Sequence, residues 1–128
     1  MSVEFINPPG LSKGSYSHVA VVNSGRMIFI SGQVATNAAG QIVGTTFAEQ
    51  ANQVFENLKV ALQASGAGFS NVVKMNTYVR DLTGTRVKAF REIRSKYLGE
   101  HCPASTLVAT PGLVHEDMML EVEVIAVV

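Results

Sequence analysis

The closing run, residues 118–128, is the most strand-like segment of the chain and limits what it can fold into. Even positions from 120 to 128 are all apolar, and odd positions from 119 to 127 are apolar except for Glu121 and Glu123. Side chains alternate between the faces of a strand, and a strand with one solvated face carries polar residues all along that face. The run therefore predicts a strand covered on both faces. Glu121 or Glu123 would then point into a largely apolar, partly buried place, where a carboxylate can have a function.

The chain is long enough for one domain and contains ample apolar residues for its core. It has 128 residues, of which 47% are hydrophobic and 16% are charged, so we expect one ordered domain over residues 1–128. The formal net charge is +0 and no basic run occurs, which gives a nucleic-acid partner little electrostatic support. The low charge fraction of so small a domain favours an oligomer that covers part of its apolar surface.

Cysteine and histidine are too scarce for a disulfide framework or for a metal site of recognisable spacing. Cys102 is the only cysteine, and the only histidines are His18, His101 and His115, so we predict neither a metal nor a cofactor. A single cysteine fits a reducing compartment. The N-terminal residues lack the layout of a signal peptide, and no apolar run is long enough to cross a bilayer. We therefore predict a cytoplasmic protein with no membrane partner.

Turn residues divide the first part of the chain into loops and short strands. Residues 7–14 include two prolines and two glycines and predict a loop. The stretches 16–22 and 27–30 flank an Asn-Ser-Gly-Arg turn, which predicts a β-hairpin. Gly32 follows the second of these strands directly, which indicates a bulge or the close approach of another group. Residues 41–43 are a candidate edge strand.

Two amphipathic helices are predicted. Thr46 and Glu49 have the spacing of a capping box, and apolar residues then recur at helical spacing until Gly66 or Gly68. The second helix ends at Gly99, and its many Arg and Lys side chains are mostly expected to face solvent.

The elements alternate in an order that predicts an α+β fold. Strands at 71–80 and 105–110 join the closing strand, and the whole order is strand, strand, helix, strand, helix, strand, strand. A single sheet with two helices on one face accounts for this order. Its other face, which would include Met119, Ile125 and Val127, then has no covering segment in this chain, so self-association is expected.

Several motifs, taken together, resemble one known family. They are Ser31-Gly32-Gln33, Tyr78-Val79-Arg80-Asp81-Leu82, Pro103-Ala104-Ser105 and the run from Leu120 to Ala126. In this order they resemble the Rid (YjgF) family of reactive-intermediate deaminases, nearly from end to end. The resemblance implies a chorismate-mutase-like fold, with a mixed six-stranded sheet, two helices on one face, and a homotrimer with ligand clefts between subunits. The best-known members of that family hydrolyse small imines and enamines to a 2-oxo acid and ammonia, so the resemblance implies a reaction of this kind.

The resemblance also assigns roles to individual residues. Glu121 matches the carboxylate that orients or activates water, and is the catalytic candidate. The expected ligand-binding positions are Tyr16, Ser31, Gly32, Arg91, Ser105 and Leu107. Of these, Ser105 stands where the archetypal deaminases have an arginine that grips the substrate carboxylate, and Leu107 stands in place of a cysteine. Arg91, near a position that is often asparagine, is a candidate for a displaced cation, so the ligand could still be a carboxylate.

Alternative interpretations remain for these residues and for the function. Glu121 could instead be paired structurally at a subunit interface, and Ser105 would be a nucleophile only with a base beside it. Three classes of function compete: a deaminase-like hydrolase with an altered substrate, a small-molecule-binding trimer without catalysis, and a ribonuclease or translation inhibitor. The neutral charge balance argues against the third class.

Overall fold

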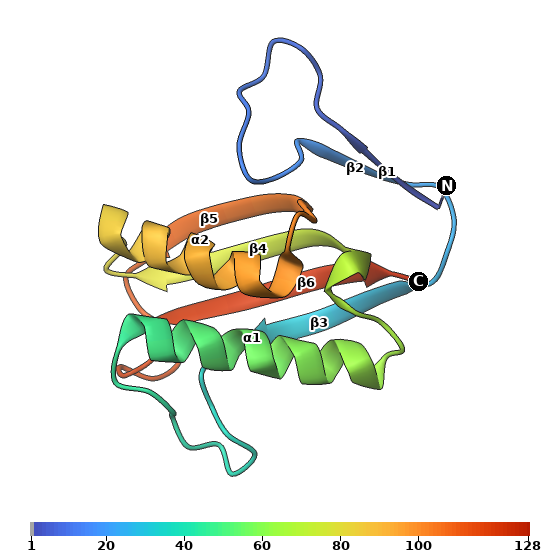
Figure 1. Cartoon of the computed structure of the whole chain (residues 1–128). Coiled ribbons are helices and arrows are strands. Elements are labelled where there is room, and N and C mark those ends of the chain that lie inside the picture. Colours follow the sequence, from blue (N-terminus) through green and yellow to red (C-terminus); the bar gives the residue numbers. More distant parts are fainter. Residues whose placement is uncertain (1) are drawn as a thin grey trace.

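The computed structural model describes residues 2–128 and contains six strands and two α-helices (Figure 1). In chain order the elements are β1 (Val3–Ile6), β2 (Val19–Val22), β3 (Met27–Gln33), α1 (Phe47–Ala64), the 3-10 helix η1 (Phe69–Asn71), β4 (Val72–Arg80), α2 (Gly84–Leu98), β5 (Ala104–Thr110) and β6 (Leu120–Val127). The strands form a four-stranded mixed sheet in the order β3-β6-β4-β5 and a two-stranded sheet of β1 and β2. Only β4 and β5 run parallel within the larger sheet.

Both helices lie against one face of the four-stranded sheet, as predicted (Figure 1). The core lies between these two layers, where the α1 stripe of Val54, Phe55, Leu58 and Leu62 meets Phe90 of α2. Phe55 packs against Phe90 and stacks on Tyr97, with ring centroids 5.7 and 5.1 Å apart. The sheet contributes alternate positions of β4 and β6, which are buried under the helices, while the intervening positions are half-buried except for the buried Val73 and Val127. The predicted α+β class is confirmed.

The start of α1 and the end of α2 are those indicated by the sequence, while α1 ends at Ala64, slightly before the predicted Gly66 or Gly68. The Thr46 hydroxyl accepts a hydrogen bond from the Glu49 N–H at 3.2 Å, and the Glu49 carboxylate accepts one from the Thr46 N–H at 3.0 Å. The capping box is therefore complete. At the end of α2, Gly99 has φ 58°, a left-handed conformation that glycine adopts at little cost.

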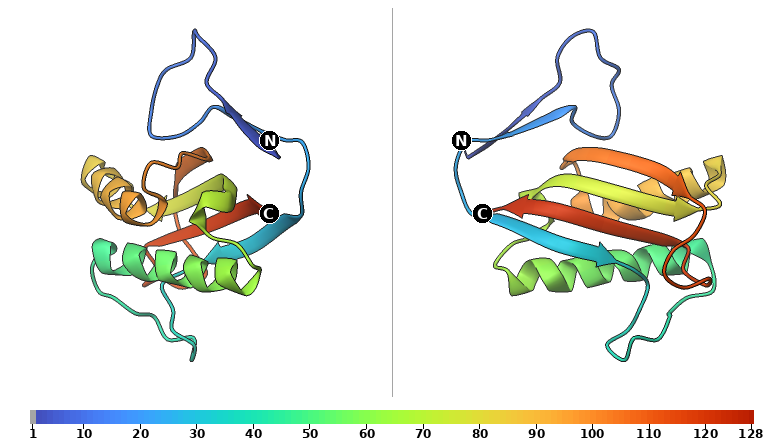
Figure 2. Two further views of the ribbon diagram at one scale, coloured as in Figure 1. Left: turned by 45° about the vertical axis from the view of Figure 1, so that its right-hand side comes forward. Right: turned by 180° about the vertical axis from the view of Figure 1, so that it is seen from behind.

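The predicted pairing of 16–22 with 27–30 is wrong. Strand β2 pairs instead with β1, which was not predicted from the sequence, and β3 pairs with β6. Gly25, at φ 114°, turns the chain away after β2, and Arg26 then exchanges two backbone hydrogen bonds with Val128, of 2.6 and 3.0 Å. The strands are consequently divided between two sheets, and the β1–β2 hairpin stands apart from the larger sheet on the side of β5 (Figures 1 and 2).

The other face of the four-stranded sheet carries no helix, as the view from behind shows (Figure 2). We call it the open face. The candidate edge strand at 41–43 is reduced to one bridge between Thr36 and Ile42, so it does not extend the sheet.

Candidate functional site

The open face carries both carboxylates of β6. Glu121 and Glu123 alternate with the buried Leu120, Val122 and Val124, and both are half-buried. They lie opposite Tyr78 and Asn76 of β4 in the antiparallel register. A carboxylate pair with two polar neighbours therefore occupies the middle of an otherwise apolar strand.

Glu123 is held by hydrogen bonds. Its Oε1 accepts one from the Tyr78 hydroxyl at 2.9 Å and one from the Asn76 amide at 3.2 Å. The pKa of Tyr78 is raised, first because its hydroxyl donates to Glu123, then because of burial and the negative charges of Glu123 and Glu121. One oxygen of Glu123 is thus fixed by two hydrogen bonds.

Glu121 lies across the backbone of Gly32. A side chain at position 32 would collide with the Glu121 carboxylate, since its Cβ would come within 2.8 Å of Cδ and closer still to Oε2. Gly32 lies where the β3–β6 register shifts, between Ile30 and Gln33, as the sequence indicated. In the described part of the chain, no protein group donates a hydrogen bond to Glu121 and no cation pairs with it. Its oxygens are available to a ligand or water.

A shallow hollow of about 300 Å³ lies beside this pair on the open face. It is lined by Phe29, Ile30, Ser31, Lys74, Asn76, Glu123, Val124 and Ile125. Lys74 brings a positive charge to the hollow, and its Nζ donates to the Thr106 hydroxyl at 3.0 Å. The hollow therefore combines an apolar floor with charged groups of both signs.

A second group of polar residues gathers where the loop before β2 meets the start of β5. The Ser17 N–H donates to the Pro103 carbonyl at 3.1 Å, and its hydroxyl donates to the Cys102 carbonyl at 2.6 Å. Arg94 of α2 donates to the Ser15 hydroxyl at 2.5 Å. Burial, followed by the neighbouring Arg91, lowers the pKa of the Arg94 guanidinium. We call Ser15, Tyr16, Ser17, Arg94, Cys102 and Ser105 the loop cluster.

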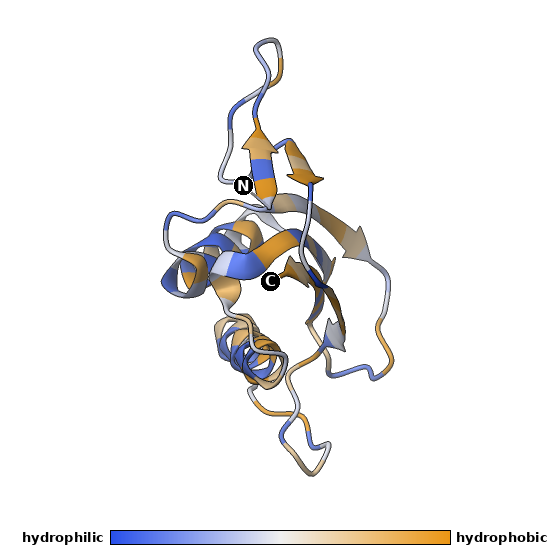
Figure 3. Ribbon diagram, turned by 90° about the vertical axis from the view of Figure 1, so that its right-hand side faces the viewer, coloured by the Kyte–Doolittle hydropathy of each residue, from blue (hydrophilic) through white to orange (hydrophobic). Residues whose placement is uncertain are grey.

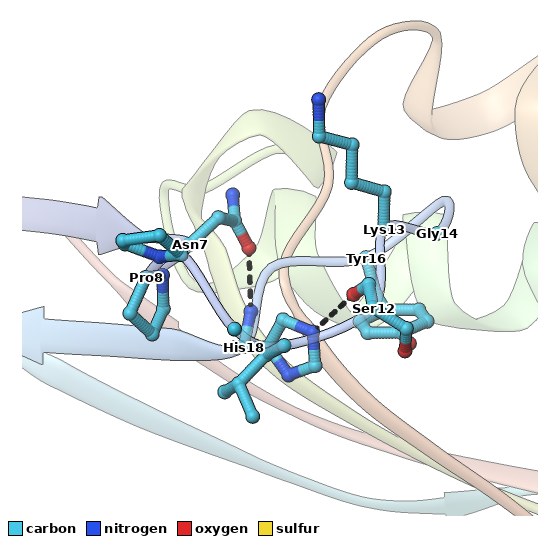
Figure 4. Close-up of a pocket in the computed structure, with 10 residues that line it drawn as sticks. Asn7, Pro8, Ser12, Lys13, Gly14, Tyr16 and His18 are labelled. Carbon is cyan, nitrogen blue, oxygen red and sulfur yellow. Dashed lines mark hydrogen bonds between the residues drawn. The ribbon is translucent and has the colours of Figure 1, made fainter.

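The loop between β1 and β2 surrounds a hollow of about 520 Å³ (Figure 4). Figure 4 shows the His18 N–H donating to Asn7 Oδ1, at 2.9 Å, and the His18 ring reaching the Ser12 carbonyl. The Tyr16 ring meets the His18 ring edge-on, with centroids 5.1 Å apart. These contacts fix the position of Tyr16 relative to β2.

The sequence and fold match one family throughout. The model of the family described as Endoribonuclease L-PSP matches residues 8–128. The chain belongs to the Rid/YjgF family. Among similar proteins, HMF1 of Saccharomyces cerevisiae is 36% identical, with 84% of this chain and 81% of that protein covered. The human 2-iminobutanoate/2-iminopropanoate deaminase is 31% identical, with 89% and 80% covered.

Solved structures of the Rid/YjgF family share the fold. The Rid-family protein YyfB of Yersinia pestis, described as of unknown function, is 32% identical and superposes with a TM-score of 0.92 over 100% of both chains. The yeast protein YEO7 is 31% identical and superposes with a TM-score of 0.74 over 98% of both chains.

The structure brings together only part of the site predicted from the family resemblance. Ser31, Gly32 and Glu121 meet at the β3–β6 pair, beside or on the open face. Leu107 packs against the core under the helices, and Ser105, two residues earlier on β5, shares that side of the sheet. Within one chain Ser105 and Glu121 therefore lie on opposite faces.

The other two predicted residues lie away from Glu121. Tyr16 belongs to the loop cluster, and the bridge between Ser17 and Ala104 places it by the start of β5. Arg91 is exposed on α2. Arg94, three residues on, is half-buried and contacts the loop. Sequence patterns do not single out Arg94, because its partner is far away in the chain.

Residues 2–128 contain neither a cluster of metal-ligating side chains nor a membrane-spanning helix. No group of three or more His, Cys, Asp or Glu side chains is arranged to hold a metal ion. No helix in this range is long and apolar enough to cross a membrane.

Proposed function

We propose that this protein is a deaminase-like hydrolase of small imines, enamines or related amino metabolites, acting at clefts between the subunits of a cytoplasmic homotrimer. The single observation that carries the proposal is the Glu121 carboxylate over Gly32. It is half-buried, faces the open side of the sheet, and has no protein partner among residues 2–128. The activity printed in the name of the human relative supports the same reaction class.

The reaction needs one base and one water. Glu121 accepts a proton from water as the water oxygen bonds to the imine carbon, and the imine nitrogen takes up a proton. The resulting carbinolamine loses ammonia as its carbon–nitrogen bond breaks, and a carbonyl compound remains. Glu123 is less suited to this role, because the Tyr78 hydroxyl and the Asn76 amide already donate to its Oε1.

The substrate is expected to differ from that of the archetypal deaminases. Ser105 offers one neutral hydroxyl where a bidentate arginine is expected. The half-buried guanidinium of Arg94, at the loop cluster, is better placed than the exposed Arg91 to supply a cation there. We propose that Arg94 takes part of the role of the missing arginine for a carboxylate ligand.

The test compares Glu121→Gln with Glu123→Gln in the intact protein. Imines are generated by a threonine dehydratase from serine or threonine, alongside a panel of other imines and enamines, and carbonyl release is followed. Loss of a general base costs about 10²- to 10⁴-fold in rate, so Glu121→Gln should lose at least about 100-fold on any accepted substrate. Glu123→Gln should lose much less, and unfolding curves should confirm that both variants fold. Equal losses would contradict the assignment.

A binding protein without catalysis is the second candidate, and the absence of an arginine at Ser105 favours it. If ligands bind equally to wild type and Glu121→Gln, and neither turns them over, this candidate replaces the first. Ribonuclease activity has weaker support, because the net charge is +0; an RNA-cleavage assay should show no activity above background.

A further inference from the structure

Among the described residues, β1, β2, β3 and β5 are all edge strands of their sheets, and two of these edges concern us here. Strand β3 pairs only with β6, and β2 pairs only with β1, among the described strands. Each therefore presents a row of backbone donors and acceptors that another strand can pair with. Both also expose large apolar side chains: Phe29 is 72% exposed on β3, and Val19 is 39% exposed on β2. Figure 3 shows that both hairpin strands are mostly hydrophobic.

An isolated two-stranded hairpin is at best marginally stable in water, so pairing with a further strand would stabilise this one. Strands β2 and β3 are suited to pair with each other. Both are apolar edge strands, and the turn between them in the sequence predicts that they pair. In the structure they do not pair. A partner for each must come from elsewhere.

Within one chain, the hairpin is held beside β5 and therefore cannot also pair with β3. Ser17 bonds to Cys102 and Pro103 at the start of β5, and Phe5 of β1 meets the His101 ring edge-on at 5.4 Å. Strands β5 and β3 are opposite edges of the four-stranded sheet, about 14 Å apart at three strand spacings. Folding back onto its own β3 would break all of these contacts.

We propose that the hairpin is exchanged between copies: β2 of one copy pairs antiparallel with the free edge of β3 in a second copy. This completes a six-stranded sheet from two chains. With the register that the Asn-Ser-Gly-Arg turn would have given, Ala20 lies opposite Phe29 and His18 lies opposite Ser31. The Tyr16 of one copy then lies beside Gly32 of the other, next to Glu121.

The exchange also explains why the predicted site is divided within one chain. The contacts of Ser17 and Arg94 carry the loop cluster along with the hairpin, so Tyr16, Arg94 and Ser105 of one copy reach Gly32 and Glu121 of another. The pairing itself does not depend on catalysis by Glu121.

The comparison structures are consistent with two arrangements in the family. The TM-score is 0.92 with the Yersinia protein and 0.74 with the yeast protein, at nearly equal identity and coverage. Residues 2–25 are about a fifth of the chain. A different placement of a segment of that length is one difference that would lower the TM-score by this amount.

Disulfide trapping tests the exchange. In a Cys102→Ala background, Ala20→Cys is combined with Phe29→Cys, and separately His18→Cys with Ser31→Cys. Opposite residues of an antiparallel pair have Cα atoms about 4.5 to 5.5 Å apart, within disulfide range. The matched control pairs Ala20→Cys with Val60→Cys, an exposed position on α1. The oxidised proteins are separated on a denaturing gel without reductant.

We expect both test pairs to give covalent species of two or more chains, and the control pair to give little. A monomer with an internal disulfide, identified by mass spectrometry, would overturn the proposal in favour of a hairpin that folds back. Unlinked monomers from both pairs would also overturn it. Repeating the trap with Glu121→Gln separates this outcome from failure of the proposed activity, because the links should form equally well.

Discussion

The two faces of the four-stranded sheet serve different ends. Under the helices, Val54, Phe55, Leu58 and Phe90 are fully buried, and ring packing links α1 to α2. On the open face, Glu121 lies half-buried over a glycine without a protein partner, beside a hollow that contains Lys74 and Glu123. The helix-covered face therefore contributes most of the stabilising burial. The open face can carry polar and charged groups, such as Glu121, that contribute little to stability.

The strongest test of this contrast removes a ring from the helix-covered face. Phe55→Ala deletes a fully buried side chain that contacts Phe90, Phe69 and Tyr97. Such truncations cost about 3 to 5 kcal/mol, a large part of the 5 to 15 kcal/mol typical of a domain. Urea unfolding should show this loss, while activity per folded molecule stays near that of wild type. Val60→Ala, exposed on the same helix, should change stability little.

On the open face, Gly32→Ala should produce the reverse result. The added Cβ displaces the Glu121 carboxylate, and a misplacement of about 1 Å can cost about 100-fold in rate. The carboxylate can swing into solvent, so we expect a smaller change in the free energy of unfolding than for Phe55→Ala. Gly112→Ala, where a Cβ meets open space, is the control for kcat/KM. An unchanged kcat/KM in Gly32→Ala would contradict the proposal that the open face carries the functional site.

Tyr97→Phe gives a smaller, pH-dependent effect on the helix layer. The Tyr97 hydroxyl donates to Glu56 at 2.8 Å, and Asn52 Oδ1 lies 2.9 Å from the same hydroxyl oxygen. Burial, followed by the bond to Glu56, raises the pKa of Tyr97 to about 12. Because the folded-state pKa exceeds the ordinary value of 10, the associated stability is complete below pH 10 and is lost as pH rises toward 12. The variant should lose about 1 kcal/mol at pH 8. Its deficit should shrink in urea titrations between pH 10 and 12.

The smallest effect is expected at the start of α1. Hydrogen bonds from Thr46, followed by those from Thr45, lower the pKa of Glu49 from its ordinary 4.5. Its stabilising contribution is therefore present above pH 4.5 and lost as pH falls through the lowered value. Glu49→Gln should have a slightly lower thermal midpoint at pH 7, and the difference from wild type should shrink as the pH falls below 4.5. Turnover at pH 7 should not change, since this helix end is remote from the open face.

Local physics explains what could be predicted from the sequence. The capping box at Thr46 and the glycine at the end of α2 are encoded within a few residues, and α1 begins and α2 ends where these residues indicate. The alternation in β6 located the carboxylates, and Gly32 was expected at a close approach before its neighbour was known. Each of these features depends on spacing along one segment.

Long-range pairing explains what could not. The turn at residues 23–26 suits a hairpin, but β1 competes for β2, and the Arg26 contacts with Val128 settle the start of β3 on β6. The opposite orientations of Ser105 and Glu121 depend on the register of β5 and β6 against β4. Strand register cannot be predicted from local sequence patterns. A list of predicted site residues therefore does not show whether these residues lie close together in one chain.

The close fit of Glu121 over Gly32 also has a consequence for directed evolution. A larger residue at position 32 is blocked while the glutamate is present, and a shorter residue at 121 leaves a gap that only a larger neighbour fills. Substitutions at two touching positions of this kind are not additive. Libraries that randomise the two codons one at a time would discard variants that are viable together, so new specificities on this scaffold should be sought by varying both at once.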